Sequence, residues 1–229
     1  MTLHLTPPCT EATRRELLGY APTRGIRFAL YRDCFKRAID ITLVLIAALP
    51  TLAILLPLCL LLAAQGASPF YSQRRVGLNG RIFRMWKLRS MVPNADVLLE
   101  AHLASDPAAR AEWDRSQKLR FDPRITPLGR VIRKSSLDEL PQLWNVLRGD
   151  MSIVGPRPMM IDQMDLYPGT AYYTLRPGVT GFWQTSVRNE SSFADRAEYD
   201  TAYAKALSLR TDLAVMLRTV VVVIRGTGY

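Results

Sequence analysis

The longest apolar run in the chain extends from Ile41 to Ala64 and contains no charged side chain. Its only polar side chains are two threonines. A helix of about 20 apolar residues is long enough to cross the hydrocarbon core of a bilayer. A helix of this length in a soluble protein would be expected to carry a polar face, and this segment has none. The pattern therefore predicts a membrane element over residues 41–64.

Basic residues flank the apolar run on both sides. They are Arg24, Arg27, Arg32, Lys36 and Arg37 before it, and Arg74, Arg75, Arg81, Arg84, Lys87 and Arg89 after it. Because basic flanks prefer the cytoplasmic side, a straight crossing would force one of them outside. Pro50 removes a backbone donor near the middle of the run and bends a helix there. We therefore predict a re-entrant helix with both ends in the cytoplasm, and a straight span is the alternative.

The remaining pattern predicts a mainly helical protein with a small β component. Alternation over residues 81–91 predicts a short strand, and the glycine and proline in residues 66–73 indicate a turn. Residues 94–117 predict one or two surface helices, interrupted near Asp106-Pro107. Further helices are expected over residues 128–134, 136–147 and 195–225. The last of these has an apolar face that belongs either to the core or to the membrane interface.

These elements suggest three parts in a chain of 229 residues. Residues 1–23 contain several prolines and little periodicity, and we expect a flexible segment there. Residues 24–73 form the basic approach and the re-entrant membrane helix. Residues 74–229 form a cytoplasmic catalytic domain of the α+β class, with interfacial amphipathic helices.

The net charge of +10 is concentrated in basic blocks, one of which directly follows the apolar run. Such blocks attract phosphate in nucleic acid, lipid headgroups or nucleotides, and their position beside an apolar segment favours a membrane surface. Cys9, Cys34 and Cys59 have neither metal-type spacing nor a disulfide pattern, which fits a reducing compartment. The two histidines are far apart, so a Ser-His-Asp triad or a histidine zinc site is poorly supported.

Candidate chemistry lies in residues 136–158, where the adjacent acids Asp138 and Glu139 precede a Gly155-Pro156-Arg157-Pro158 loop. Carboxylates can attack phosphorus or bind a metal, and an arginine held between prolines can grip a phosphate with its planar donors. The simpler interpretation is a capping box, because Ser136 lies three residues before Glu139 and Pro141 marks a helix start. Arg157 also fits an ordinary solvated loop. The residues alone leave these alternatives open.

The run SLDELPQLWNVLRGDMSIVGPRP at 136–158, with KLRSM at 87–91 and RPGVTGFWQ at 176–184, resembles the bacterial sugar transferase family. These enzymes are the monotopic phosphoglycosyl transferases, and the resemblance extends from about Tyr31 to the C-terminus. Members transfer a sugar phosphate from a UDP-sugar to a polyprenyl phosphate, usually undecaprenyl phosphate, with Mg²⁺, and release UMP. The resemblance implies that Asp138 is the nucleophile of a covalent sugar-phosphate intermediate. It implies that Glu139 supports the metal or handles the proton.

Several further site residues are expected from this assignment. Cationic side chains are needed around two phosphate-bearing substrates, and Arg157, Arg133, Lys87 and Arg176 are the candidates, with Gln142 as a further substrate-binding residue. Asp138 and Glu139 are the expected Mg²⁺ ligands. Leu49 precedes Pro50, where the family usually has serine. Residues 185–200 are expected either to line the sugar site or to form an ordinary loop and helix.

The resemblance therefore implies an exopolysaccharide-initiating hexose-1-phosphate transferase, specific for galactose or glucose, with galactose favoured. We expect it in the bacterial inner membrane, with the catalytic domain in the cytoplasm and UDP-sugar, undecaprenyl phosphate and membrane lipid as partners. A membrane-tethered basic module that binds anionic lipid or nucleic acid would explain the charge but not the acid pair. A Mg²⁺-dependent phosphohydrolase would use the same carboxylates with water as acceptor. The chain has no recognisable nucleic-acid motif, so no nucleic acid is expected, and a homo-oligomer is left open.

Overall fold

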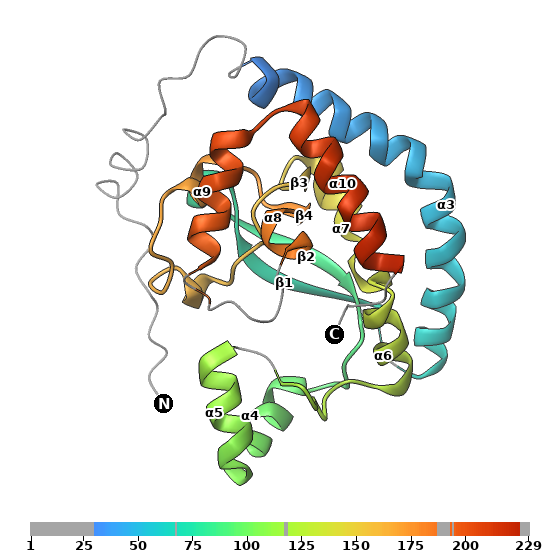
Figure 1. The fold of residues 1–229 in the computed structure, drawn as a ribbon. Helices are drawn as coiled ribbons and strands as arrows, with labels where there is room; N and C mark the ends of the chain where they lie inside the picture. Colours follow the sequence, from blue (N-terminus) through green and yellow to red (C-terminus); the bar gives the residue numbers. More distant parts are fainter. Residues whose placement is uncertain (1–29, 67, 117–118, 187–192, 194, 225–229) are drawn as a thin grey trace.

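The computed structural model describes residues 30–66, 68–116, 119–186, 193 and 195–224. The main elements are η1 (Tyr31–Phe35), α3 (Lys36–Ala64), β1 (Phe70–Val76), β2 (Ile82–Leu88), α4 (Ala95–Ser105), α5 (Pro107–Ser116), α6 (Pro127–Lys134), η3 (Leu137–Glu139), α7 (Gln142–Arg148), β3 (Ser152–Val154), β4 (Gly178–Thr180), α8 (Phe182–Thr185), α9 (Arg196–Ala206) and α10 (Leu209–Ile224). Short 3-10 turns lie at Leu78–Gly80, Ile161–Gln163 and Ala171–Thr174. Helices surround two small sheets, which confirms the predicted fold class (Figure 1). The expected flexible segment 1–23, and Arg24 and Arg27, lie outside the described residues.

Helix α3 contains the apolar run and is the one described helix long and apolar enough to cross a membrane. Its most apolar window has a mean hydropathy of 2.6, yet only 6% of that window is buried within the protein. Large apolar side chains stand exposed along it, including those of Leu45, Ile46, Leu49, Leu52 and Leu56. The core helix of a soluble protein would bury such side chains. The exposed surface of α3 is therefore of the kind that lipid covers.

Both ends of α3 contact the same domain. Its first half packs against α7 and β3, and near its other end Leu58 and Leu62 pack with Leu88 and Ile132. Between these contacts the helix curves around the outside of the domain (Figure 1). It remains continuous through Pro50 and Pro57, and proline is a common cause of such bending. A curved helix with both ends against one domain fits the predicted re-entrant arrangement.

A buried polar network fixes the beginning of α3 to the domain. The ammonium of Lys36 lies 2.6 Å from the Asp212 carboxylate, which also accepts hydrogen bonds from the hydroxyls of Tyr31 and Tyr203. Four residues after Lys36, the Asp40 carboxylate accepts hydrogen bonds from the side chain of Ser152 and the backbone of Ile153. Because buried charges need partners, these contacts set the position of α3 relative to α10 and β3.

The two sheets are short and differ in direction. Strands β1 and β2 form an antiparallel hairpin in which Phe70 lies opposite Leu88 and Val76 opposite Ile82. Strands β3 and β4 are parallel. The strand expected over residues 81–91 is confirmed as β2, but the turn expected over residues 66–73 is wrong from Phe70 onward. The backbone there pairs with β2, a non-local contact that outweighs the local turn signals.

Apart from residues 136–147, the expected helices are confirmed, although residues 195–225 form two helices, α9 and α10. The choice left open for the apolar face of the last helix is also resolved. Helices α4 and α5 are interrupted at Asp106, and α6 starts one residue earlier than expected, where the side chain of Thr126 caps it. In α10 the expected apolar face stays largely exposed rather than in the core. Its exposed members are Leu209, Leu213, Leu217, Val220, Val221 and Ile224. Val215 and Met216 pack inward instead.

Candidate active site

The acid pair lies on a short 3-10 turn, and the single helix expected over residues 136–147 is wrong. Ser136 has a positive φ of 56° and its side chain makes no capping hydrogen bond, so the capping-box alternative is also wrong. Pro141 has no N–H to continue a helical hydrogen-bond series, and α7 begins only after it. The chain therefore bends twice around Asp138 and Glu139, which places both side chains beside β2.

Strand β2 brings Lys87 to this acid pair. The Lys87 ammonium lies 3.2 Å from an Asp138 oxygen and 2.9 Å from a Glu139 oxygen, and it bridges the two carboxylates. The register of β2 against α7 is fixed by Asn145, whose side chain is fully buried. This side chain accepts a hydrogen bond from the Trp86 N–H and donates one to the Arg84 carbonyl. These hydrogen bonds between α7 and β2 thus hold Lys87 opposite the carboxylates.

Asp138 is the more buried of the two carboxylates. Its burial raises the pKa of this carboxyl above the usual range, against the opposing charge of Lys87. The negative charge of Glu139 acts in the same direction as burial, and Arg133 on α6 helps Lys87 to oppose it. A desolvated carboxylate is a stronger nucleophile once ionised, and nearby cations keep it ionised. Asp138 is therefore a desolvated carboxylate that lies close to two cationic side chains.

The loop that carries Arg157 is held by close backbone packing. The Gly155 N–H donates to the Thr180 carbonyl at 2.9 Å, and the Gly178 N–H donates to the Pro156 carbonyl at 2.8 Å. A Cβ on Gly155 would lie 2.3 Å from the Arg176 carbonyl oxygen, and one on Gly178 would lie 2.1 Å from the Gly155 nitrogen. Only glycine permits this approach. The loop therefore leaves β3 in a fixed direction and presents Arg157 to the site.

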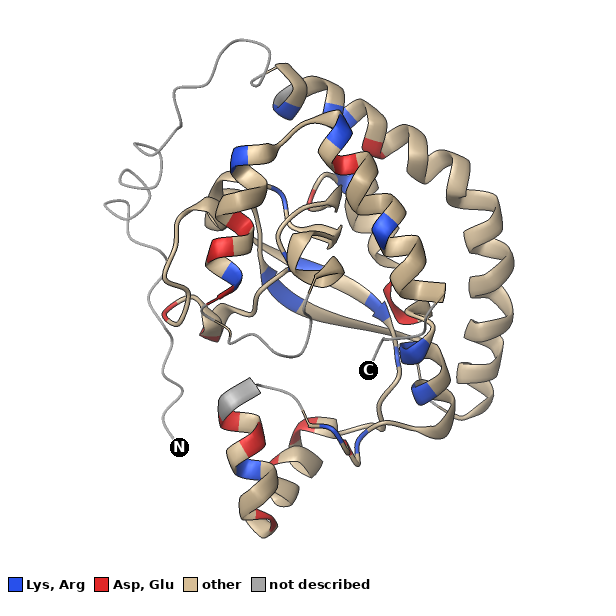
Figure 2. Ribbon diagram, viewed as in Figure 1, with Lys and Arg blue, Asp and Glu red and all other residues tan. Residues whose placement is uncertain are grey.

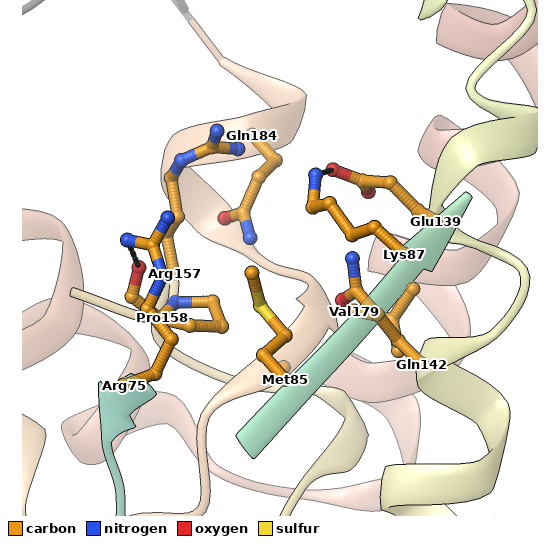
Figure 3. Close-up of a pocket in the computed structure, with 10 residues that line it drawn as sticks. Arg75, Met85, Lys87, Glu139, Gln142, Arg157, Pro158, Val179 and Gln184 are labelled. Carbon is orange, nitrogen blue, oxygen red and sulfur yellow. Dashed lines mark hydrogen bonds and ion pairs between the residues drawn. The ribbon is translucent and has the colours of Figure 1, made fainter. Parts of the chain in front are cut away.

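These elements meet at a small pocket that is open to solvent. Its lining is Arg75, Met85, Lys87, Glu139, Gln142, Arg157, Pro158, Gly178, Val179 and Gln184. Figure 3 shows Arg157 and Gln184 on one side of the opening and Lys87 and Glu139 on the other. The pocket thus places cations on both sides of a carboxylate pair.

The structure brings most of the predicted site residues together. Lys87, Glu139, Gln142 and Arg157 line the pocket, and Asp138 lies directly behind Lys87. Arg133 acts on Asp138 through its charge. Arg176 does not line the pocket, because its side chain turns away to donate to the Gly149 carbonyl at 3.1 Å. Only part of the expected segment 185–200 is described, because residues 187–192 and 194 lie outside the described residues.

Sequence reasoning missed three residues around Arg157. Arg75 on β1 donates to the Pro158 carbonyl at 3.2 Å, and Arg196 at the start of α9 stacks on the Trp183 ring at 4.4 Å. Arg75 was expected only as one of the basic residues that follow the apolar run. Arg196 was expected only as part of residues 185–200, either beside the sugar or in an ordinary loop and helix. Trp183 is the third residue. The RPGVTGFWQ motif was the only signal for Trp183. Burial, followed by the charge of Arg157, lowers the pKa of Arg75 to about 10 and that of Arg196 to about 9.

The donor set at the acid pair fits Mg²⁺. Within the described part of the chain no group of three or more His, Cys, Asp or Glu side chains is clustered for a metal. Mg²⁺ commonly takes only one or two carboxylates from the protein and fills its other positions with water and substrate phosphate. Asp138 and Glu139 supply that number, and the ammonium of Lys87 shows that a cation is accepted between them. They are the residues that would hold the ion.

The structure thus combines a carboxylate pair, arginines across an open pocket, and an adjoining helix with an exposed apolar surface. The sequence matches the Bacterial sugar transferase family over residues 31–226. The chain therefore belongs to the bacterial sugar transferase family, as the sequence motifs predict.

Three relatives illustrate this membership. The chain is 46% identical over 199 residues to a UDP-galactose-lipid carrier transferase of Erwinia amylovora, covering 84% of this chain and 41% of the relative. It is 45% identical over 198 residues to an undecaprenyl-phosphate galactose phosphotransferase of Salmonella typhimurium, with the same coverage. It is 44% identical over 196 residues to the exopolysaccharide production protein ExoY of Sinorhizobium fredii, covering 84% of this chain and 87% of the relative. The chain thus spans less than half of two relatives and most of the third.

Proposed function

We propose that this protein transfers a hexose-1-phosphate from a UDP-sugar to undecaprenyl phosphate and so starts exopolysaccharide assembly. The observation that carries the proposal is the Lys87-bridged carboxylate pair opposite Arg157, at the foot of a helix with an exposed apolar surface. We favour galactose as the sugar because two of the relatives are named for galactose transfer. Glucose differs at a single hydroxyl and is the other candidate.

In the proposed reaction an oxygen of Asp138 attacks the phosphorus that carries the sugar. A carboxyl–phosphate bond forms, the bond between the two phosphates breaks, and its electron pair leaves on the oxygen of UMP. A phosphate oxygen of undecaprenyl phosphate then attacks the same phosphorus and releases the Asp138 carboxylate. Two displacements replace one difficult step, as in other enzymes with aspartyl-phosphate intermediates.

The surrounding side chains would serve these displacements electrostatically. Lys87 and Arg133 would keep Asp138 ionised, and Arg157 would bind the phosphate that leaves with UMP. Asp138 and Glu139 would hold Mg²⁺, which would supply positive charge for the substrate phosphates. Glu139 would hold the ion or take up a proton.

The proposed location follows from α3. Its exposed apolar surface would lie in one leaflet of the inner membrane, and the basic residues on both flanks favour the cytoplasmic side. The polyprenyl acceptor lies in lipid with its phosphate at the interface. A site at the foot of a re-entrant helix would meet that phosphate without moving the acceptor across the membrane.

UMP release from purified full-length protein tests the proposal. With UDP-galactose, Mg²⁺ and undecaprenyl phosphate we expect continuous UMP release, and without acceptor at most one UMP per enzyme. Asp138→Asn should abolish release while the protein remains folded and membrane-bound. Continuous UMP release without acceptor would indicate a hydrolase. If the protein cleaves no nucleotide, a lipid-binding module would be the remaining interpretation. Normal lipid-linked product from the Asp138→Asn protein would refute the covalent mechanism.

A further inference from the structure

Three arginines are gathered on the side of the pocket opposite the acid pair. Arg157 and Arg196 both stack on the Trp183 ring, with guanidinium carbons 5.3 and 4.4 Å from its centroid. Arg75 lies beside the same loop, and the charge of Arg157 acts on both Arg75 and Arg196. Holding like charges together is unfavourable unless an anion neutralises them.

The described part of the chain offers these arginines only longer-range counter-charges, from Asp200 to Arg196 and from Asp162 to Arg75. None of the three forms an ion pair with a described carboxylate. Asp200, one helical turn after Arg196, accepts a hydrogen bond from the Tyr167 hydroxyl at 2.8 Å, and its charge offsets that of Arg196 only in part. The Nε atoms of Arg75 and Arg196 are buried without a hydrogen-bond partner. Buried donors of this kind are uncommon and call for a partner that the described side chains do not supply, such as an ion or a water molecule.

We propose that Arg75, Arg157 and Arg196, with Trp183 as their common support, form the subsite for the phosphate of the nucleoside monophosphate half of the donor. This inference rests on the proposed function and adds Arg75 and Arg196 to it. Arg75 and Arg157 line the open pocket and would face the phosphate, while Arg196, on the Trp183 ring, would orient Arg157 and add to the positive potential.

The position of the cluster favours the nucleotide over the lipid acceptor. On the acid-pair side, Leu137 packs with Leu58 and Leu62 of α3 and Ile132 of α6, so this side adjoins the membrane helix. The arginines come from β1, the loop after β3 and α9. Figure 3 shows Arg75 and Arg157 across the opening from Lys87 and Glu139. A lipid phosphate approaching along α3 would reach the acid pair first.

Binding measurements on the full chain in nanodiscs, with EDTA to remove metal, test this subsite. The probes are UMP, uridine and geranyl phosphate, the last as a soluble stand-in for the lipid phosphate. We expect Arg196→Gln and Arg75→Gln each to raise the Kd for UMP about tenfold, equivalent to about 1.4 kcal/mol. Their Kd for uridine and geranyl phosphate should stay unchanged. The exposed Arg148, whose nearest carboxylate lies at 3.5 Å, provides the control Arg148→Gln, which should bind all three probes normally.

The outcomes separate this inference from the proposed function. Arg196→Lys keeps the positive charge and is the milder change, so it replaces Arg196→Gln if that variant does not fold. Its Kd for UMP should lie between those of the wild type and Arg196→Gln. Folded variants that bind UMP like the wild type would overturn the subsite, even if the wild type transfers sugar phosphate. Weaker binding of geranyl phosphate but not UMP would assign the cluster to the acceptor and also overturn it. If the variants lose UMP binding as expected but the wild type transfers no sugar phosphate, the proposed function alone would be refuted.

Discussion

Replacing Lys87 with methionine should destabilise the site measurably, because this side chain is the direct cation partner of two adjacent carboxylates. Fully buried pairs lose about 3–5 kcal/mol when one partner is removed, whereas exposed pairs lose about 0–1 kcal/mol. The side chains of Lys87, Asp138 and Glu139 are 23%, 11% and 27% exposed, so this cluster lies between those limits. We expect a loss of about 2 kcal/mol, or about 4–8 °C in Tm for a chain of this size.

The pH dependence of this loss has a definite sign. Without Lys87, the pKa of the Asp138 carboxyl, which burial already raises, would rise further. A carboxyl whose folded pKa exceeds its unfolded value costs nothing below the ordinary pKa of about 3.9 and reduces stability as the pH rises above it. The Tm difference between Lys87→Met and wild type should therefore be larger at pH 8 than at pH 5.

Thermal unfolding in detergent, followed by intrinsic fluorescence with and without Mg²⁺, provides the assay. The matched control is Arg110→Met, which removes an exposed pair with Glu100 at 3.8 Å and should shift Tm by less than about 1 °C. Sugar-phosphate transfer by Lys87→Met should also fall about 100-fold, as for loss of one preorganised donor. Equal Tm values for the two variants at pH 8 would refute the view that Lys87 neutralises the acid pair.

Three further predictions concern the loop, a buried carboxyl and the membrane helix. Gly178→Ala should lower Tm by at least about 5 °C and reduce transfer, because its Cβ would lie 2.1 Å from the Gly155 nitrogen; an unchanged Tm would contradict the close packing. Burial raises the pKa of Asp200 to about 7, so wild-type stability should decline between about pH 4 and pH 7. Asp200→Asn should flatten that decline, and parallel Tm–pH curves for the two proteins would contradict this prediction. Single cysteines at Cys34 and at Ser68→Cys, on either side of α3, should react with an impermeant maleimide only after cell lysis, and labelling of either in intact cells would exclude the re-entrant arrangement.

Sequence patterns were sufficient where a signal is local. The uncharged run of α3, the alternation of β2 and the break at Asp106-Pro107 each show directly in a short window of residues. Strands β3 and β4 are only three residues each, too short for any periodicity, and they pair because glycines allow their backbones to approach. The 3-10 turn at the acid pair was not predicted, because the capping-box sequence pattern of Ser136 and Glu139 is present without the hydrogen bond of a cap.

The residues of the candidate site likewise fall into those that a sequence motif indicates and those that no local pattern indicates. Lys87, Asp138, Glu139 and Arg157 stand within motifs, and the structure assembles them as expected. Arg75 and Arg196 are separated by more than half of the chain, and no local pattern links either to Arg157. Arg176 stands in a motif yet turns to a backbone carbonyl, because the direction of a side chain is set by packing and not by its neighbours in sequence.

In the proposed arrangement, the network at the start of α3 would let one short domain reach substrates in two phases. Asp40 precedes the apolar run and binds Ser152 and Ile153, the first two residues of β3. Strand β3 leads directly into the loop that carries Arg157, and the far end of α3 packs against Leu137, beside Asp138. In that arrangement the depth of α3 in lipid would set the height of both the arginine and the carboxylates above the membrane. Because these contacts are buried and short, the site would be held at a fixed level, where an interfacial phosphate and a water-soluble nucleotide would meet without a large domain motion.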